Sequence, residues 1–128
     1  MALGKIKADT LEHSTAGSLD TKFVVNGSAK VFSVVDATAS NAILKSFNIS
    51  SISDIDVGII NNSFTNNMAD ANYHNLASAD VNTVAPCTGA TASSYDTTSS
   101  ARAYAYRTDT SALVDQDKIG VLIHGDLA

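Results

Sequence analysis

The chain has 128 residues, a formal net charge of −5 and one cysteine, and charged residues make up only 16% of it. This length predicts one domain, since domains contain roughly 100–200 residues. A single cysteine excludes an intramolecular disulfide framework and a zinc cluster built from cysteines. The acidic balance argues against nucleic acid as a partner, because phosphate binding needs clustered Lys and Arg. No apolar run approaches the roughly 20 residues of a membrane helix, so we expect no membrane insertion.

Small polar residues dominate the composition: Ser, Thr and Asn number 16, 12 and 10, which is 38 of the 128 residues. Ser and Asn disfavour long helices, because their side chains compete for backbone hydrogen bonds. The composition therefore favours an all-β protein with many turns. A domain of this size buries only a modest core, and contacts between copies would help to cover its apolar strand surface.

Residues 1–21 are predicted to form an extended N-terminal arm. Its apolar positions, including Leu3, Ile6 and Leu11, are separated by Gly and small polar residues without a sustained period. A partner surface rather than a core of its own would order such a segment, and a frayed terminus is the alternative. No apolar stretch of 7–15 residues follows Met1, so we expect no secretory signal and synthesis in a reducing cytoplasm.

Residues 22–128 are predicted to form a small antiparallel β-sandwich. Asn26-Gly27 is a strong hairpin signal, because both residues tolerate positive φ. Residues 78–100, which contain the only proline, are expected to be a long loop or a pair of ragged strands. Short strands separated by turn residues are typical of a sandwich or small barrel. The segments with strand character are 22–25, 29–35, 43–49, 52–59, 73–76, 101–106 and 118–124.

Motifs for enzymatic chemistry are absent from the sequence. It has no Gly-x-Ser-x-Gly, phosphate-binding glycine loop or dinucleotide fingerprint. The three histidines are isolated, with no second His at i+2 or i+4 to share a metal. The acidic pairs Asp54/Asp56 and Asp115/Asp117 each offer two carboxylates, but calcium takes 6–8 oxygens, and we interpret them as a solvent face and a polar turn. Neither a catalytic residue, a metal nor a cofactor is predicted.

Tyrosine and arginine gather in the last third of the chain, at Tyr95, Arg102, Tyr104 and Tyr106. These residue types are enriched at binding surfaces. In segment 101–106 they alternate with alanines, which predicts a strand with one bulky and one flat face. The alternative is that Tyr104 and Tyr106 pack against a neighbouring strand or subunit.

The segment 36–54 (DATASNAILKSFNISSISD) resembles one found in phage tail-fibre and virion-appendage proteins, especially of marine phages. In that family the corresponding segment reads Ile-x-x-Ser-Phe-Asn-Val-Ser-Ser-Ile-Thr-Asp. The segment 64–73 is similar to the family's Phe-Thr-x-x-Met-x-Asp-x-x-Tyr, and weaker similarity extends over 8–30 and 121–126. The chain departs from the pattern where alanines replace glycines after Asp36, and where Ile55-Asp56-Val57 replaces an Asn-Gly-type turn.

The resemblance implies a phage virion structural protein, assembled as a homotrimer and made in the cytoplasm of a bacterial host. It implies a short tail fibre or appendage that docks to other virion proteins through its N-terminal arm and displays a β-domain outwards. Leu3, Ile6 and Leu11 are the docking residues we expect on that arm. Because Met1 stands almost directly before the arm, a stub fibre without a long shaft is expected. The family pattern carries no catalytic or metal-binding residue over to this chain.

Host-surface recognition is the second role that we expect, through the 78–100 segment and the four residues Tyr95, Arg102, Tyr104 and Tyr106. Hydroxyl and amide side chains suit the hydroxyls of carbohydrate, and tyrosine offers a flat apolar face to a sugar ring. One alternative is a capsid-decorating or tail-adaptor protein that only stabilises the particle. Another is a free carbohydrate-binding module, which would be monomeric.

Overall fold

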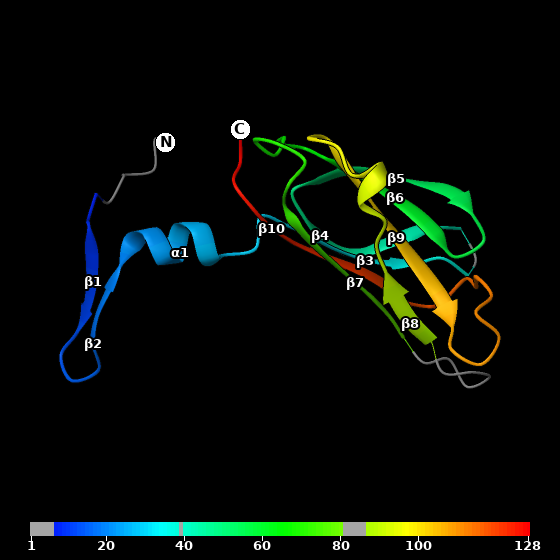
Figure 1. The fold of residues 1–128 in the computed structure, drawn as a ribbon, viewed down its shortest axis with the longest axis horizontal. Coiled ribbons are helices and arrows are strands. Elements are labelled where there is room, and N and C mark those ends of the chain that lie inside the picture. Colours follow the sequence, from blue (N-terminus) through cyan, green and yellow to red (C-terminus); the bar gives the residue numbers. More distant parts are fainter. Residues whose placement is uncertain (1–6, 39, 81–86) are drawn as a thin grey trace.

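The computed structural model describes residues 7–38, 40–80 and 87–128. Strands make up 54% of the structure and helices 9%, and the sheets are antiparallel. Two four-stranded sheets pack against each other, and a two-stranded hairpin followed by a short helix extends to one side of them (Figure 1). The all-β, sandwich-like fold predicted from the composition and the strand pattern is therefore confirmed.

Each sheet is built from strands that are distant in the sequence. In the first sheet, which we call the β3 sheet, the order is β4 (Ala42–Phe47), β3 (Val31–Asp36), β10 (Ile119–His124) and β7 (His74–Ala79). In the second, the β9 sheet, the order is β5 (Ile49–Asp56), β6 (Ile59–Phe64), β9 (Ser100–Arg107) and β8 (Cys87–Ala90). A 3₁₀ turn, η1 (Ser93–Tyr95), lies between β8 and β9.

The core lies between the sheets and follows the alternation of their strands. In β10, Ile119, Val121 and Ile123 are buried, as the pattern of 118–124 predicts. In β9 the flat face of alanines (Ala101, Ala103 and Ala105) is the buried one, so the bulky residues of this strand face outwards. A hydrogen bond across the core joins the sheets, because the Ser33 hydroxyl donates to Asn62 Oδ1 at 2.7 Å.

The segment before the sandwich forms β1 (Thr10–His13), β2 (Gly17–Asp20) and α1 (Thr21–Gly27). The strand predicted at 22–25 and the hairpin turn at Asn26-Gly27 are therefore wrong. This segment has no ladder partner among the described strands, and a helix satisfies its backbone groups locally. Thr21 joins helix to hairpin, since its N–H donates to the Asp9 carbonyl at 2.9 Å and its hydroxyl to Ala8 at 2.6 Å.

The two strands predicted at 43–49 and 52–59 correspond to three observed strands, β4, β5 and β6. Asn48 takes a left-handed φ of 58° between β4 and β5, so segment 43–49 begins in one sheet and ends in the other. Gly58, with φ +67°, lies at a tight turn between β5 and β6, so segment 52–59 is a hairpin rather than one strand. Alternation alone missed both breaks, because apolar residues recur on either side of the turns.

Between residues 73 and 100, strand pairing extends further than the sequence pattern predicts. The segment predicted at 73–76 continues to Ala79 in β7. Within 78–100 the described residues contain β8 and η1, and an isolated bridge between Thr97 and Ser100 closes the turn before β9. Over its described residues, segment 78–100 is therefore partly paired rather than one long loop.

Candidate functional site

The outer face of the β9 sheet holds the predicted Tyr and Arg cluster. Arg102, Tyr104 and Tyr106 lie on this face because the alanines between them fill the core. Residues on the neighbouring strands continue the face: the register places Asn61 opposite Arg102, and Ile59 opposite Tyr104. The face is thus an aromatic row along β9 beside a mixed polar and apolar row along β6.

The four predicted residues form two stacked pairs. The Arg102 guanidinium lies over the Tyr95 ring, 4.0 Å from its centroid, and the rings of Tyr104 and Tyr106 stack with centroids 6.2 Å apart. Arginine over an aromatic face is held by cation–π attraction. Tyr95 is 49% exposed, whereas Tyr104 is only 8% exposed. Tyr104 therefore packs in the sheet, as the alternative interpretation of the strand proposed, and Tyr95 offers a ring to solvent.

A polar cluster lies behind the Tyr95–Arg102 pair. Asn75 Nδ2 donates to Asp96 Oδ1 at 3.2 Å and lies 3.5 Å from the Arg102 carbonyl. Burial raises the pKa of the Asp96 carboxyl above its ordinary value, although hydrogen bonds from Asn75 and the Arg102 backbone oppose the rise. Burial likewise raises the pKa of the Tyr73 hydroxyl, which lies within 3.0 Å of two backbone carbonyls. This cluster fixes the turn that carries Tyr95.

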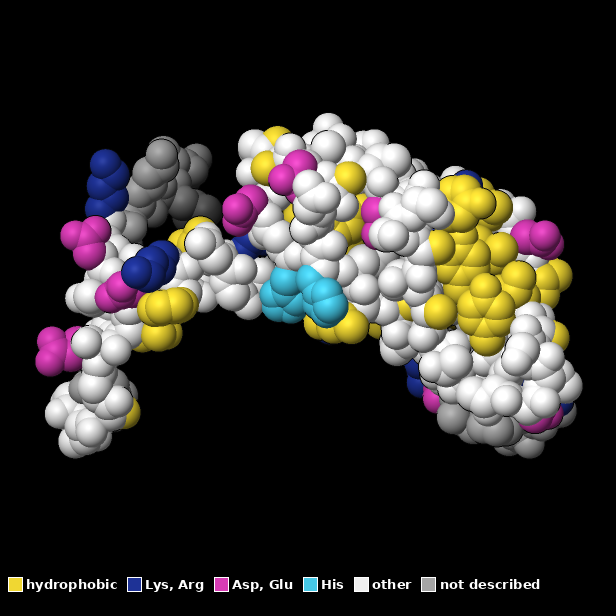
Figure 2. Space-filling model, viewed as in Figure 1, with side chains coloured by type: hydrophobic (Ala, Val, Ile, Leu, Met, Phe, Trp, Pro, Cys, Tyr) yellow, Lys and Arg dark blue, Asp and Glu magenta, His cyan; other side chains and the backbone are white. Residues whose placement is uncertain are grey.

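An apolar patch continues the face at the end of the sandwich remote from the hairpin (Figure 2). Ile55 and Val57, at the β5–β6 turn, are 44% and 51% exposed. The sequence pattern missed them as surface residues, because it placed both within a continuous strand. The signal that could have shown the turn is Asp56-Val57-Gly58, where the Asp56 carboxylate accepts the Val57 N–H at 2.8 Å.

The acidic residues of the two pairs accept hydrogen bonds from nearby backbone and side-chain groups. Asp54 accepts a hydrogen bond from Asn41 Nδ2 at 2.8 Å, and Asp115 accepts the Gly58 N–H at 2.7 Å. Among the described residues no group of three or more His, Cys, Asp or Glu side chains could hold a metal ion. Cys87 is half-buried at the start of β8, with Gln116 Nε2 3.0 Å from its sulfur.

The fold brings together two histidines that are 50 positions apart in the sequence. His74 and His124 are directly opposite each other on β7 and β10, and Figure 2 shows histidine side chains gathered on the surface there. The sequence pattern does not show this pair, because only histidines within four positions of each other were considered as a shared metal site. Two imidazoles supply half of the four ligands that a structural zinc site uses, so the pair alone is an incomplete metal site.

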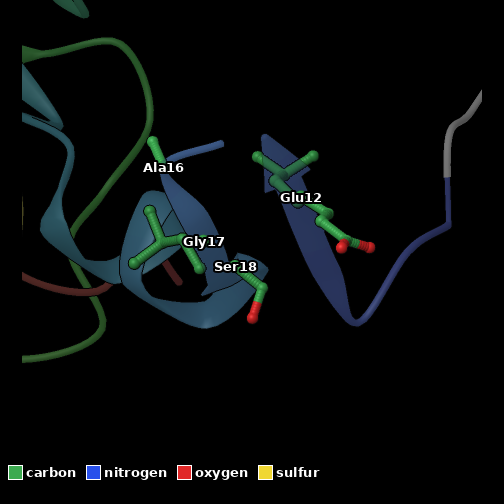
Figure 3. Close-up of a pocket in the computed structure, with 6 residues that line it drawn as sticks. Glu12, Ala16, Gly17 and Ser18 are labelled. Carbon is green, nitrogen blue, oxygen red and sulfur yellow. The ribbon is translucent and has the colours of Figure 1, made fainter. Parts of the chain in front are cut away.

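The predicted docking residues of the arm are only partly described. Leu3 and Ile6 lie outside the described residues, and Leu11 is on β1 with half of its surface exposed. Leu11 borders a shallow hollow of about 440 Å³ in the hairpin, where Glu12 extends from β1 and Gly17 and Ser18 come from the opposite strand (Figure 3). It also borders a larger groove of about 650 Å³ between hairpin and helix, lined on the helix side by Val24 and Val25.

In the part of the chain that the structure describes, no helix has the length and apolar character needed to span a bilayer. Comparison with protein-family models, with curated proteins and with solved structures finds no match to this chain.

Proposed function

We propose that the chain is a phage virion structural protein, a short tail fibre or appendage that assembles as a homotrimer. Its N-terminal arm docks to other virion proteins, and its sandwich-like domain attaches the particle to carbohydrate on the host surface. The observation that carries the proposal is the separation of two surfaces. The hairpin and helix, which expose Leu11, Leu19 and Phe23 among polar residues, extend from one side of the domain, and an apolar patch of the β9 sheet lies at the far end (Figures 1 and 2).

The resemblance of segments 36–54 and 64–73 to virion-appendage proteins supports this assignment. Segment 36–54 supplies β4 and most of β5, whereas segment 64–73 contributes the last residue of β6, Phe64, and an isolated bridge from Met68 to Leu127. The residues Asn48 and Asn66, one from each segment, hydrogen-bond to each other, with the Asn66 N–H donating to Asn48 Oδ1 at 2.7 Å. The residues that carry the resemblance are thus residues that shape this domain.

Carbohydrate is the ligand class that suits the outer face of the β9 sheet. Arg102 stacks on one side of the Tyr95 ring and holds it in place, and nearly half of the Tyr95 surface faces solvent. An exposed aromatic ring packs against the apolar face of a sugar. The amide of Asn61 and the hydroxyls of Ser51 and Ser53 lie on the same sheet and can exchange hydrogen bonds with sugar hydroxyls.

Adsorption of virions to host cells tests the proposal. Virions with Tyr95→Ala should adsorb at least tenfold more slowly, because the ring is lost, and those with Tyr95→Phe should adsorb at close to the wild-type rate. Asp70→Asn, an exposed substitution outside this face, is the control. Wild-type adsorption by the Tyr95→Ala virions would refute the receptor role.

Deletion of the whole chain separates the proposal from its alternatives. Intact particles that no longer adsorb support a fibre or appendage, and fragile particles would show a capsid-decorating or tail-adaptor protein instead. Light scattering gives the third distinction, because the proposal requires a trimer and a free carbohydrate-binding module would be a monomer.

A further inference from the structure

We propose that the hairpin and helix of one copy dock onto the outer face of the β3 sheet of a second copy. This inference rests on the proposed homotrimer and names the contact that would build it. The docking element is the segment from β1 to α1, and the receiving surface is an apolar row that crosses all four strands of the β3 sheet. Both surfaces are exposed within a single chain.

The receiving surface follows from the strand register. Phe47 lies opposite Phe32, Phe32 lies opposite Leu122, and Leu122 lies opposite Leu76, so one apolar residue from each strand falls on the same line. The rings of Phe32 and Phe47 stack with centroids 6.1 Å apart. Phe47, Leu76 and Leu122 are 55%, 48% and 38% exposed, which is a large uncovered apolar row for the outside of a sheet.

A groove lies beside this row at the centre of the sheet. It has a volume of about 390 Å³ and is bounded by the apolar row on one side and by Val34, Gly120 and Ser78 on the other. Gly120 has no side chain of its own, and the Ser78 hydroxyl lies over it, 2.5 Å from where a Cβ would stand. The volume of the groove is nevertheless enough to accept a large side chain from outside.

The docking element exposes apolar side chains of matching size. α1 has no buried residue, and Phe23, Val24 and Val25 are 59%, 43% and 61% exposed. The hairpin adds Leu11 and Leu19, each about half exposed. A two-stranded hairpin is at best marginally stable alone in water, so this segment gains order from a surface that covers it.

The arm is held away from its own β3 sheet. Three residues separate α1 from β3, a reach of about 10 Å. The last of them, Lys30, is buried, and its ammonium group donates to the carbonyls of Val25 and Ser28 and so fixes the end of the helix. Figure 1 shows α1 directed away from the sandwich. A second copy is therefore the occupant that the geometry favours.

Charge and size also fit a second copy. The described part of the arm has three carboxylates, on Asp9, Glu12 and Asp20, against two ammonium groups, whereas the cationic side chain of Lys45 flanks the apolar row. The four apolar residues of the row and the five of the arm together provide an area on the order of 1,000 Å², the size at which a specific interface begins. Because arm and face differ, the contact is heterologous, and in the proposed homotrimer it closes in a ring of three copies.

Mixing two variants of the full chain tests the contact by light scattering. Phe23→Asp places a charge on the apolar surface of the arm and leaves the face intact. Leu76→Glu places a charge on the face and leaves the arm intact. Each variant alone should be a monomer, with at least a tenfold loss of association. Their mixture should form a 1:1 dimer, because the intact arm of the Leu76→Glu chain can dock onto the intact face of the Phe23→Asp chain. Phe47→Glu is a second face variant, should Leu76→Glu fold poorly by circular dichroism.

The control is Val57→Glu, an equally exposed apolar residue at the end of the other sheet, which should leave the wild-type mass unchanged. A face variant that still assembles would show that the arms associate with each other and would overturn the inference, while the trimer itself would stand. Assembly of Phe23→Asp alone would show face-to-face packing and would also overturn the inference, as would failure of the mixture to form a dimer. A monomeric wild-type chain would contradict the proposed assembly as a whole.

Discussion

Gly58 shows how one backbone position fixes the remote end of the sandwich. Its φ of +67° lies in the region that L side chains rarely adopt, and its N–H donates to Asp115. Its carbonyl accepts the Ala105 N–H at 2.8 Å, so the turn is tied to β9 and to the segment before β10. The exposed patch around the β5–β6 turn depends on this residue for its position.

Gly58→Ala should destabilise the fold by about 2–4 kcal/mol, since the left-handed conformation and the lack of space both oppose a side chain. An added Cβ would lie 2.7–2.8 Å from the backbone atoms of Val114 and Ala105. Urea unfolding measures the loss. Gly27→Ala, in α1 with no atom within 4 Å of the new Cβ, should change stability by less than about 0.5 kcal/mol. Equal costs at the two glycines would contradict the argument.

Asp96 should make the stability depend on pH. Burial raises the pKa of its carboxyl in the folded state above its ordinary value. The folded chain then holds a proton that the unfolded chain has lost, so stability falls as pH rises from about 4 through the folded pKa. The difference in unfolding free energy between Asp96→Asn and the wild type should grow over this range by less than about 1 kcal/mol, because the group is partly exposed. A flat difference between pH 3 and 7 would show that the carboxyl is not desolvated.

At the scale of elements, the strands that the alternation predicts well are those with one fully buried side. β10 and β9 were recognised because Ile119, Val121 and Ile123, and the alanines of β9, repeat every second residue. The alternation does not show the breaks between β4 and β5 and between β5 and β6, because each depends on one residue with positive φ, Asn48 or Gly58. The valines of α1 favour a strand by their propensity. A strand forms only where a neighbouring strand can pair with it, and among the described strands none pairs with this segment.

Asn48 provides the test of the crossover between the sheets. It holds φ at 58°, and its side chain bonds to the backbone of Asn66 in both directions, at 2.7 Å and 3.0 Å. Asn48→Ala and Asn48→Gly both remove these bonds, but only alanine is strained at this φ. Asn48→Ala should therefore be less stable than Asn48→Gly by about 1 kcal/mol in urea unfolding. If the two variants unfold at the same midpoint, the left-handed backbone stores no strain there.

At the scale of the molecule, two apolar surfaces and one aromatic face surround a core that is largely Val, Ile and Ala. The sequence predicts the Tyr and Arg cluster because its members are close together along the chain. It does not predict how they stack, because the Tyr95–Arg102 contact depends on the turn before β9. The apolar row of the β3 sheet was beyond sequence reasoning as well. Its members, such as Phe32 and Leu76, come from four strands and meet only through the register.

Hydrogen exchange at two protein concentrations should show how the arm is covered. The amides of β1, β2 and α1 should exchange rapidly in dilute solution, because these elements bury no side chain against the sandwich, and at least tenfold more slowly once copies associate. The amides of β10 pair on both sides within the β3 sheet and should be protected at both concentrations, which provides the internal reference. Arm amides that stay protected in a monomer would mean that the arm folds back onto its own sandwich.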